Sequence, residues 1–216
     1  MANQKQSYAD NVPGDFFVDQ TCIDCDLCRQ IAPATFREES DHAFVWRQPE
    51  TSEDRMRSLM ALVACPTGSI GSRRKEDMRP AIAAFPELVA ENVYFCGFAS
   101  ERTYGASSYL IVRPEGNILV DSPRFAQHLV ARIEALGGVR LMCLSHSDDV
   151  GDHQKFHDHF GCDRIIHAAE GGNMTAERML EGYDPVPVGS DLLAIPTPGH
   201  TRGHLVWLYR HKFLFT

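Results

Sequence analysis

The chain carries the stretch Cys22-Ile23-Asp24-Cys25-Asp26-Leu27-Cys28, and a fourth cysteine follows far downstream in the pair Cys65-Pro66. Three cysteines at intervals of three residues can turn their sulfurs towards one centre, and a fourth from a distant segment can close the cage. Four soft thiolate ligands are how proteins hold a [4Fe-4S] cluster. This pattern uses four of the seven cysteines, and it predicts one cluster bound by Cys22, Cys25, Cys28 and Cys65.

Other uses of these cysteines fit the sequence less well. A disulfide framework is typical of small secreted domains, whereas residues 1–20 lack the apolar run of a signal peptide, so we expect a cytoplasmic protein. A structural zinc site usually shows two Cys-x-x-Cys pairs, and the chain has no second pair. The other cysteines, Cys96, Cys143 and Cys162, are predicted to be small buried residues, with Cys162 the most exposed.

The residues around the cysteines carry a resemblance to a known family. Residues 17–36 and 64–70 are similar to the single-cluster bacterial ferredoxins, and the resemblance covers about residues 14–72. It implies an α+β ferredoxin-like domain whose cluster ligands stand at the four cysteines named above. Because Cys25 is present, the resemblance implies a four-iron rather than a three-iron cluster.

The composition favours a protein partner over nucleic acid or a membrane. The formal net charge is -8, which disfavours binding to nucleic acid or to an anionic membrane. Residues 10–54 contain eleven acidic and three basic side chains. Such a surface could steer a redox partner protein with a basic docking surface, although charge runs are more often simply solvated. No segment is long and apolar enough to span a bilayer.

A change of pattern near residues 72–86 divides the chain. Residues 72–77 are densely charged without apolar periodicity, and two prolines bracket the short apolar piece that follows. We therefore expect a ferredoxin-like domain at 1–80 (core 14–72), a linker at 81–91 and a second domain at 92–216.

Strand and helix patterns alternate in the second domain. We expect strands at 108–112 and 117–121, a helix at 125–136, a strand at 141–144, a helix at 152–160, a strand at 164–167, and a hairpin at 205–215.

Residues 196–204 read Pro-Thr-Pro-Gly-His-Thr-Arg-Gly-His. They resemble the Thr-Pro-Gly-His-Thr-x-Gly-His element of the metallo-β-lactamase superfamily, and the order of the strands and helices agrees with that family from about residue 92 onwards. The resemblance implies an αββα sandwich in which His200 is a metal ligand and His204 is not. It also implies that His146 and His200 lie near each other at one edge of the sandwich.

The second metal-binding element departs from the family. The family loop reads His-x-His-x-Asp-His, whereas residues 144–149 read Leu-Ser-His-Ser-Asp-Asp. One histidine and two carboxylates remain, and such hard oxygen donors favour iron, manganese or magnesium over a pair of zinc ions. The predicted second metal site consists of His146, Asp148, Asp149 and His200, and it would hold one Fe, Mn or Zn ion.

In the family, a strand like 213–216 is followed by Gly-Asp, whose aspartate bridges two metal ions. We therefore expect that this chain belongs to a longer protein and that its sandwich is incomplete at the C-terminus. We also expect at most one weakly held ion in the second domain, with no robust hydrolysis.

Two residues are weaker candidates for this site. His153 and His157 lie four residues apart on one helical face, a spacing that can chelate a metal ion, and His153 is the first candidate. Asp121, the second, ends a strand that faces the motif loop, where it would orient a ligand or simply form a turn.

Three functions remain open. In the first, the protein is an oxidoreductase, and the cluster transfers electrons to a metal site in the second domain. In the second, the second domain hydrolyses thioesters, phosphodiesters or lactams through a metal-bound water, and the cluster is structural or regulatory. In the third, the second domain binds no metal and serves as a docking module.

Overall fold

Two short strands that are distant in sequence pair at the start of the fold. In the computed structural model, which describes residues 2–170, 172 and 174–216, β1 (Phe16–Val18) runs antiparallel to β4 (Ile70–Ser72). Val18 lies opposite Ile70, and the Asp19 N–H donates to the Ser69 carbonyl at 2.9 Å. The loop after β1 and the loop before β4 therefore lie together, and these are the loops that carry the cysteines.

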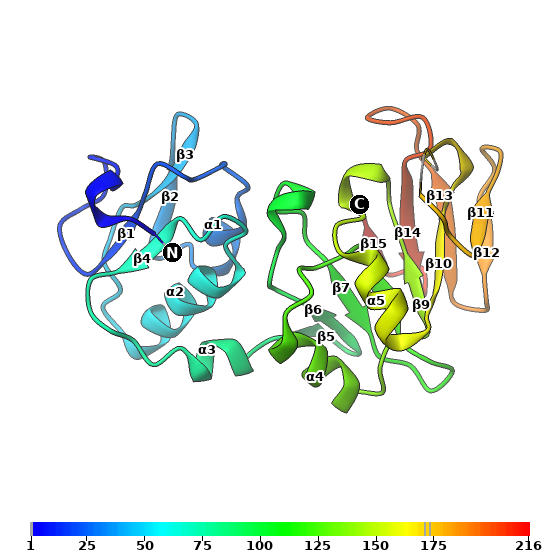
Figure 1. The fold of residues 1–216 in the computed structure, drawn as a ribbon, viewed down its shortest axis with the longest axis horizontal. Coiled ribbons are helices and arrows are strands. Elements are labelled where there is room, and N and C mark those ends of the chain that lie inside the picture. Colours follow the sequence, from blue (N-terminus) through cyan, green and yellow to red (C-terminus); the bar gives the residue numbers. More distant parts are fainter. Residues whose placement is uncertain (1, 171, 173) are drawn as a thin grey trace.

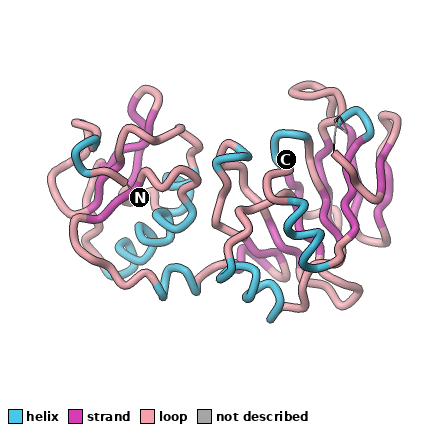
Figure 2. The backbone as a smooth tube through the Cα atoms, viewed as in Figure 1, coloured by secondary structure: helices cyan, strands magenta, loops and turns pink. Residues whose placement is uncertain are grey.

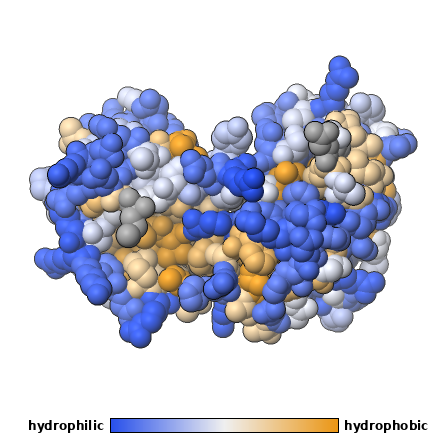
Figure 3. Space-filling view, viewed as in Figure 1, coloured by the Kyte–Doolittle hydropathy of each residue, from blue (hydrophilic) through white to orange (hydrophobic). Residues whose placement is uncertain are grey.

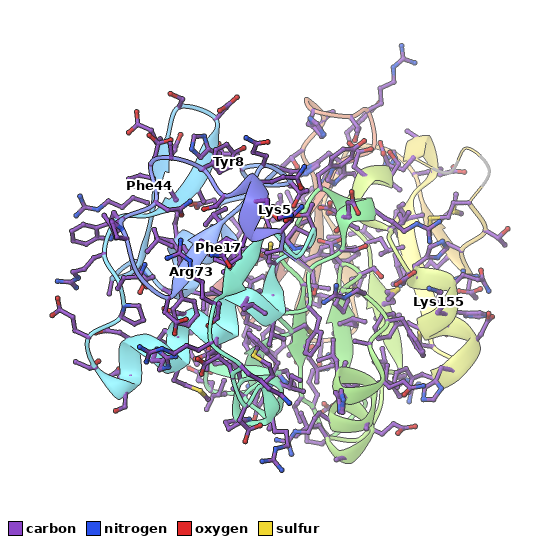
Figure 4. The ribbon with its side chains drawn as sticks, turned by 60° about the vertical axis from the view of Figure 1, so that its left-hand side comes forward. Lys5, Tyr8, Phe17, Phe44, Arg73 and Lys155 are labelled. Atoms are coloured by element: carbon purple, nitrogen blue, oxygen red, sulfur yellow. The ribbon has the colours of Figure 1, made fainter. Side chains whose placement is uncertain are left out.

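The rest of the first half packs around this ribbon. It comprises the 3-10 turn η1 (Gln4–Gln6), α1 (Leu27–Ile31), β2 (Phe36–Glu39), β3 (His42–Val45), α2 (Ser52–Ala64) and α3 (Arg79–Ala83). Helix α2 begins with a reciprocal capping box between Thr51 and Asp54, which satisfies two backbone donors at its first turn. At the N-terminus, Tyr8 stacks on His42 with 3.6 Å between ring centroids; Figure 4 labels Tyr8 on the flank of this half.

The interval 81–91, expected to be a linker, is folded into both halves. It contains the end of α3, where Ala81 is fully buried, and the fully buried Phe85. It also contains β5 (Glu87–Ala90), the edge strand of the large sheet. The sequence did not predict β5, because only three apolar residues stand between Glu87 and Glu91, directly after Pro86.

The second half is built on a seven-stranded mixed sheet (Figure 1). Its spatial order is β11-β10-β9-β8-β7-β6-β5, with parallel pairing from β8 to β11 and antiparallel pairing from β5 to β8. The remaining strands of this sheet are β6 (Val93–Phe95), β7 (Tyr109–Ile111), β8 (Ile118–Val120), β9 (Leu141–Cys143), β10 (Asp163–His167) and β11 (Arg178–Leu180).

A four-stranded antiparallel sheet faces it, formed by β12 (Val186–Val188), β13 (Leu192–Pro196), β14 (Leu205–Tyr209) and β15 (Phe213–Phe215). Alternate residues of the large sheet point to opposite faces, as strand geometry requires. Ile118 and Val120 pack with Trp207 between the two sheets, while Leu119 packs with the helix side. The tube in Figure 2 shows these strands and helices as separate layers.

Helices α4 (Gln127–Ala135) and α5 (His153–Phe160) cover the other face of the large sheet through Leu129, Ile133 and Phe156. The described residues thus form an αββ arrangement, three layers of the expected αββα sandwich. Lys155, labelled on the right of Figure 4, lies on α5.

The two halves share one core. Phe85 packs edge-on against Phe95 and Phe98, with 5.9 and 5.8 Å between ring centroids. The Ala99 N–H donates to the Ala64 carbonyl at 3.2 Å, next to Cys65, so the second half contacts the first beside a predicted cluster ligand. On the face drawn in Figure 3, the two halves touch across the lower part of the view, with an indentation between them at the top. Within the described residues, no helix has the length and apolar character needed to cross a membrane.

Candidate cluster site and candidate metal centre

The loop that carries three cysteines is held in an unusual backbone conformation. Asp24 and Asp26 adopt φ values of 53° and 66°, in the left-handed region that non-glycine residues seldom enter. The Arg29 guanidinium lies against both carboxylates, with Nη1 at 2.5 Å from Asp24 and Nε bonded to Asp26. These contacts hold the loop in a conformation that turns its cysteines inwards.

All four cysteines, Cys22, Cys25, Cys28 and Cys65, line one small cavity with a volume of about 20 Å³. The Cys22 sulfur accepts from the Asp24 and Ala43 N–H groups, each at 3.5 Å. Burial, together with the neighbouring Cys65 and Cys22 sulfurs, raises the pKa of the Cys25 thiol to about 11. Four converging sulfurs that repel one another as thiolates need a cationic centre, and this donor set fits an iron–sulfur cluster.

The second candidate site lies where β9 and β13 end. His146 follows β9 by three residues, and His200 lies in the loop between β13 and β14. The Leu205 N–H donates to the Ser145 carbonyl at 2.9 Å, which ties the two loops together. The two imidazole rings are 5.1 Å apart, as the sequence resemblance implied.

Three side chains offer ligand atoms that all lie within 4.8 Å of one another: those of His146, Asp148 and His200. Asp148 Oδ2 is 3.2 Å from His200 Nε2 and 3.9 Å from His146 Nε2. Two imidazoles and one carboxylate can hold a single metal ion on one face and leave other coordination positions open.

Asp149 is not part of this group, although the sequence predicted it as a ligand. It belongs with Asp148 to a 3-10 turn, η3 (Ser147–Asp149), and successive side chains of such a turn point in different directions. Asp149 Oδ2 lies 3.6 Å from Nδ1 of His146, whereas Asp148 approaches Nε2 of the same ring.

Asp121, predicted to orient a ligand, acts on His146 through Ser145. The Asp121 carboxylate accepts from the Ser145 N–H at 2.7 Å, and Ser145 Oγ lies 2.9 Å from His146 Nδ1. With Nδ1 directed at this hydroxyl, His146 presents Nε2 to Asp148 and His200. Burial, with the nearby Asp149 carboxylate, raises the pKa of Asp121 to about 8.

His153 lies apart from the metal candidates. Its Nδ1 is 3.1 Å from Nη1 of the buried Arg164, which also forms an ion pair with Glu177 at 2.8 Å. Burial and the Arg164 cation lower the pKa of His153, and a site beside a fixed guanidinium is unsuitable for a metal ion. The prediction of His153 as a weaker ligand therefore has no support in the geometry. His157 directs its Nδ1 at the Cys162 carbonyl, at 2.8 Å.

The remaining residues singled out by the sequence can also be placed. Leu144, where the family has a histidine, is fully buried in the core beneath the helices. Cys96, Cys143 and Cys162 are all fully buried, so the prediction that Cys162 is the most exposed of the three is wrong. It lies just after the C-cap glycine of α5 and turns into the core.

A bridging segment, residues 100–106, lies between the two candidate sites, and sequence analysis missed it. Gly105 is buried with φ +85°, and an added Cβ there would lie 2.5 Å from Cys25 Cβ and 2.9 Å from Cys25 Sγ. In the same segment, Thr103 packs against Gly151, where an added Cβ would lie 2.7 Å from Thr103 Cγ2. The segment includes the 3-10 turn η2 (Glu101–Thr103), which packs against η3. No motif marks it, because its contacts are with residues that are distant in sequence.

A comparison with family models agrees with the ferredoxin resemblance. Residues 18–72 match the family model of the 4Fe-4S single cluster domain of Ferredoxin I. No curated protein sequence matches the chain.

Several solved metallo-β-lactamases resemble the chain in part. One from Cronobacter sakazakii, with a HARLDQ motif, is 24% identical, with 56% of this chain and 57% of that chain covered and a TM-score of 0.45. A β-lactamase from Chitinophaga pinensis is 21% identical, with 56% and 55% covered and a TM-score of 0.45. FEZ-1 from Legionella gormanii is 24% identical, with 58% and 59% covered and a TM-score of 0.44. The chain thus spans little more than half the length of the structures it matches.

Proposed function

We propose that the chain is an electron-transfer protein. In this proposal, Cys22, Cys25, Cys28 and Cys65 bind one [4Fe-4S] cluster, and His146, Asp148 and His200 bind one metal ion, preferentially iron. The bound cluster would supply single electrons, and a metal ion held by His146, Asp148 and His200 would accept them. A reducing compartment such as the cytoplasm suits such a site, because all seven cysteines are free thiols in the structure.

One observation carries the proposal: the bridging segment packs on the cluster site at Cys25 and on the loop next to the second site at Gly151. Gly105 packs on Cys25, and Thr103, two residues earlier, packs on Gly151 in the loop that follows Asp148 and Asp149. Thr103 and Gly105 are both buried in these contacts. A structural or regulatory cluster would not require a buried segment that packs on both the cluster site and the loop next to the second site.

The donor set of the second site supports iron rather than a zinc pair. Two histidines and one carboxylate with open positions are typical of non-haem iron sites. Leu144 offers no ligand atom, and Asp149 lies against Nδ1 of His146 rather than in the group, so the described residues provide for a single ion. This arrangement favours redox chemistry over two-metal hydrolysis.

Intramolecular electron transfer can be measured directly. Purified protein with an intact cluster is loaded with ferric iron under anaerobic conditions, and the cluster is then reduced with less than one equivalent of dithionite. We expect the high-spin ferric EPR signal to disappear at a rate that does not change when the protein is diluted. In His200→Ala, which loses one of three ligands, we expect iron affinity to fall by at least about tenfold and the signal to be absent.

Two results would contradict the proposal. One is a ferric signal that persists beside a reduced cluster. The other is rapid turnover of a generic thioester or phosphodiester by the metal-loaded protein, which would support the hydrolase alternative.

We further propose that electrons enter from a redox protein with a basic docking surface. The Ala43 N–H on β3 donates to Cys22 Sγ at 3.5 Å, so the β2–β3 hairpin adjoins the cluster site. Its exposed tip carries Glu38, Glu39 and Asp41, and Ile23 nearby is 42% exposed. Acidic side chains on a hairpin that adjoins the cluster site can steer a cationic partner towards the cluster.

Small charged oxidants can test this steering. At low salt, we expect hexaamminecobalt(III) to oxidise the reduced cluster several-fold faster in the wild-type protein than in the double variant Glu39→Gln/Asp41→Asn. This difference in rate should vanish at about 1 M salt. The matched control is Glu181→Gln/Asp184→Asn, which removes the same charge from exposed positions of the second half. Equal slowing in both double variants would show that only net charge matters.

A further inference from the structure

One buried carboxylate joins the two loops that carry the metal candidates. Glu170 ends the 3-10 turn η4 (Ala168–Glu170) after β10 and is only 8% exposed. Its Oε2 accepts from the Ser147 N–H at 3.0 Å, and its Oε1 accepts from the Gly203 N–H at 2.7 Å. Ser147 lies between His146 and Asp148 in sequence, and Gly203 lies three residues after His200.

The surroundings of Glu170 leave little freedom in this contact. An added Cβ on Gly203 would lie 2.8 Å from Glu170 Cγ and 2.8 Å from His167 Nδ1, so the loop approaches as closely as glycine permits. His167 itself is fixed, because its Nε2 lies 2.9 Å from the Gly182 carbonyl and its Nδ1 accepts from the Ala169 N–H at 3.1 Å. His167, one of the two side chains against which Gly203 packs, is therefore held in place by its own hydrogen bonds.

The carboxylate has backbone donors instead of a cationic partner. Among the described residues, no lysine, arginine or histidine forms an ion pair with Glu170. A buried negative charge that is stabilised by N–H groups contributes to the local potential and favours a nearby cation. Asp148 and Glu170 thus place two carboxylates around the loops that hold His146 and His200.

We infer that Glu170 is a positioning residue for the second metal site, setting the separation of the His146–Asp148 loop from the His200 loop and adding negative charge that favours a divalent cation. This inference rests on the proposed function, because it concerns the same metal site. The role of Glu170 is exerted through the backbone of Ser147 and Gly203 rather than through a ligand side chain.

The test uses the full chain and manganese(II) alone as the probe. In Glu170→Gln, the amide can accept from one of the two N–H groups but presents its own donors to the other. We expect manganese(II) affinity, measured by calorimetry, to fall about 10–100-fold. We also expect the amide of Ser147 or Gly203 to exchange its hydrogen faster, with both amides affected in Glu170→Ala.

The control is Glu177→Gln, which breaks the ion pair with Arg164 in the same half without touching either loop. It is expected to lower thermal stability while leaving manganese(II) affinity and the two amides unchanged. Unchanged amide exchange in the Glu170 variants would overturn the inference. If the wild-type protein binds manganese(II), an equal affinity in the Glu170 variants would overturn it as well. If the wild-type protein binds no metal ion but the amides respond, the joining of the loops is supported and the proposed function fails instead.

Discussion

The Cys65→Ser variant is expected to lose the broad visible absorption of the protein together with the roughly four iron atoms of the cluster. Cys65 is the only cluster candidate outside the 22–28 loop, and it follows directly after α2. Without it, the remaining three sulfurs leave one corner of the cluster without a protein thiolate. Absorption spectroscopy and elemental analysis of the protein purified without oxygen measure the effect.

The same variant should also loosen the first half of the molecule. So small a region buries little apolar surface of its own, although its core continues into the second half through Ala81 and Phe85. Hydrogen exchange should therefore accelerate over residues 14–72 more than over 109–143. The control, Cys162→Ala, removes a fully buried thiol far from the cluster candidates and should keep both iron and colour. A Cys65→Ser protein with full iron content and an unaltered spectrum would show that the ligand assignment is wrong.

A single methyl group at Gly105 is expected to disturb both the stability and the electron-transfer rate. Alanine at φ +85° costs about 1–2 kcal/mol of backbone strain. Its Cβ would also lie 2.5 Å from Cys25 Cβ and 3.2 Å from Pro66 Cγ, and such overpacking costs about 1–3 kcal/mol. Together these terms predict a loss of about 2–5 kcal/mol. This corresponds to roughly 4–20 °C in Tm for a chain of this size.

The matched control for Gly105→Ala is Gly189→Ala. Gly189 also has a positive φ, +76°, but no atom lies within 4 Å of an added Cβ, so only the backbone strain is introduced. Because Gly105→Ala should push the bridging segment away from Cys25, we expect the intramolecular loss of the ferric EPR signal to slow in this variant alone. Equal stability losses in both variants, with unchanged electron-transfer rates, would show that the bridging segment does not affect the proposed electron transfer.

The pattern of residues located both candidate sites, but it did not define their geometry. The Cys-x-x-Cys-x-x-Cys spacing and the Gly-His-Thr element are local signals, and the loops in which they lie do come together in the structure. Spacing could not show that Asp148 and Asp149 diverge, because the turn that separates them becomes visible only in three dimensions. Nor could it show that His153 faces Arg164, a residue from a neighbouring strand.

The sequence by itself determined the elements whose signals are local. The strands at 109–111, 118–120 and 141–143, the helices at 127–135 and 153–160, and the hairpin at 205–215 all lie within the expected ranges. Each depends on periodicity or turn residues within a few positions of itself. The cluster cysteines belong to the same class, because three of the four are close together in the chain.

Only the tertiary structure decided what lies between and behind the two sites. Glu170 meets Ser147 and Gly203 from a distant part of the chain, and the bridging segment meets Cys25 across a still longer stretch of sequence. Such contacts depend on packing between distant segments, and this packing leaves no periodic trace in the sequence. A buried carboxylate or a close-packed glycine acquires its role from its neighbours, and those neighbours exist only once the chain has folded.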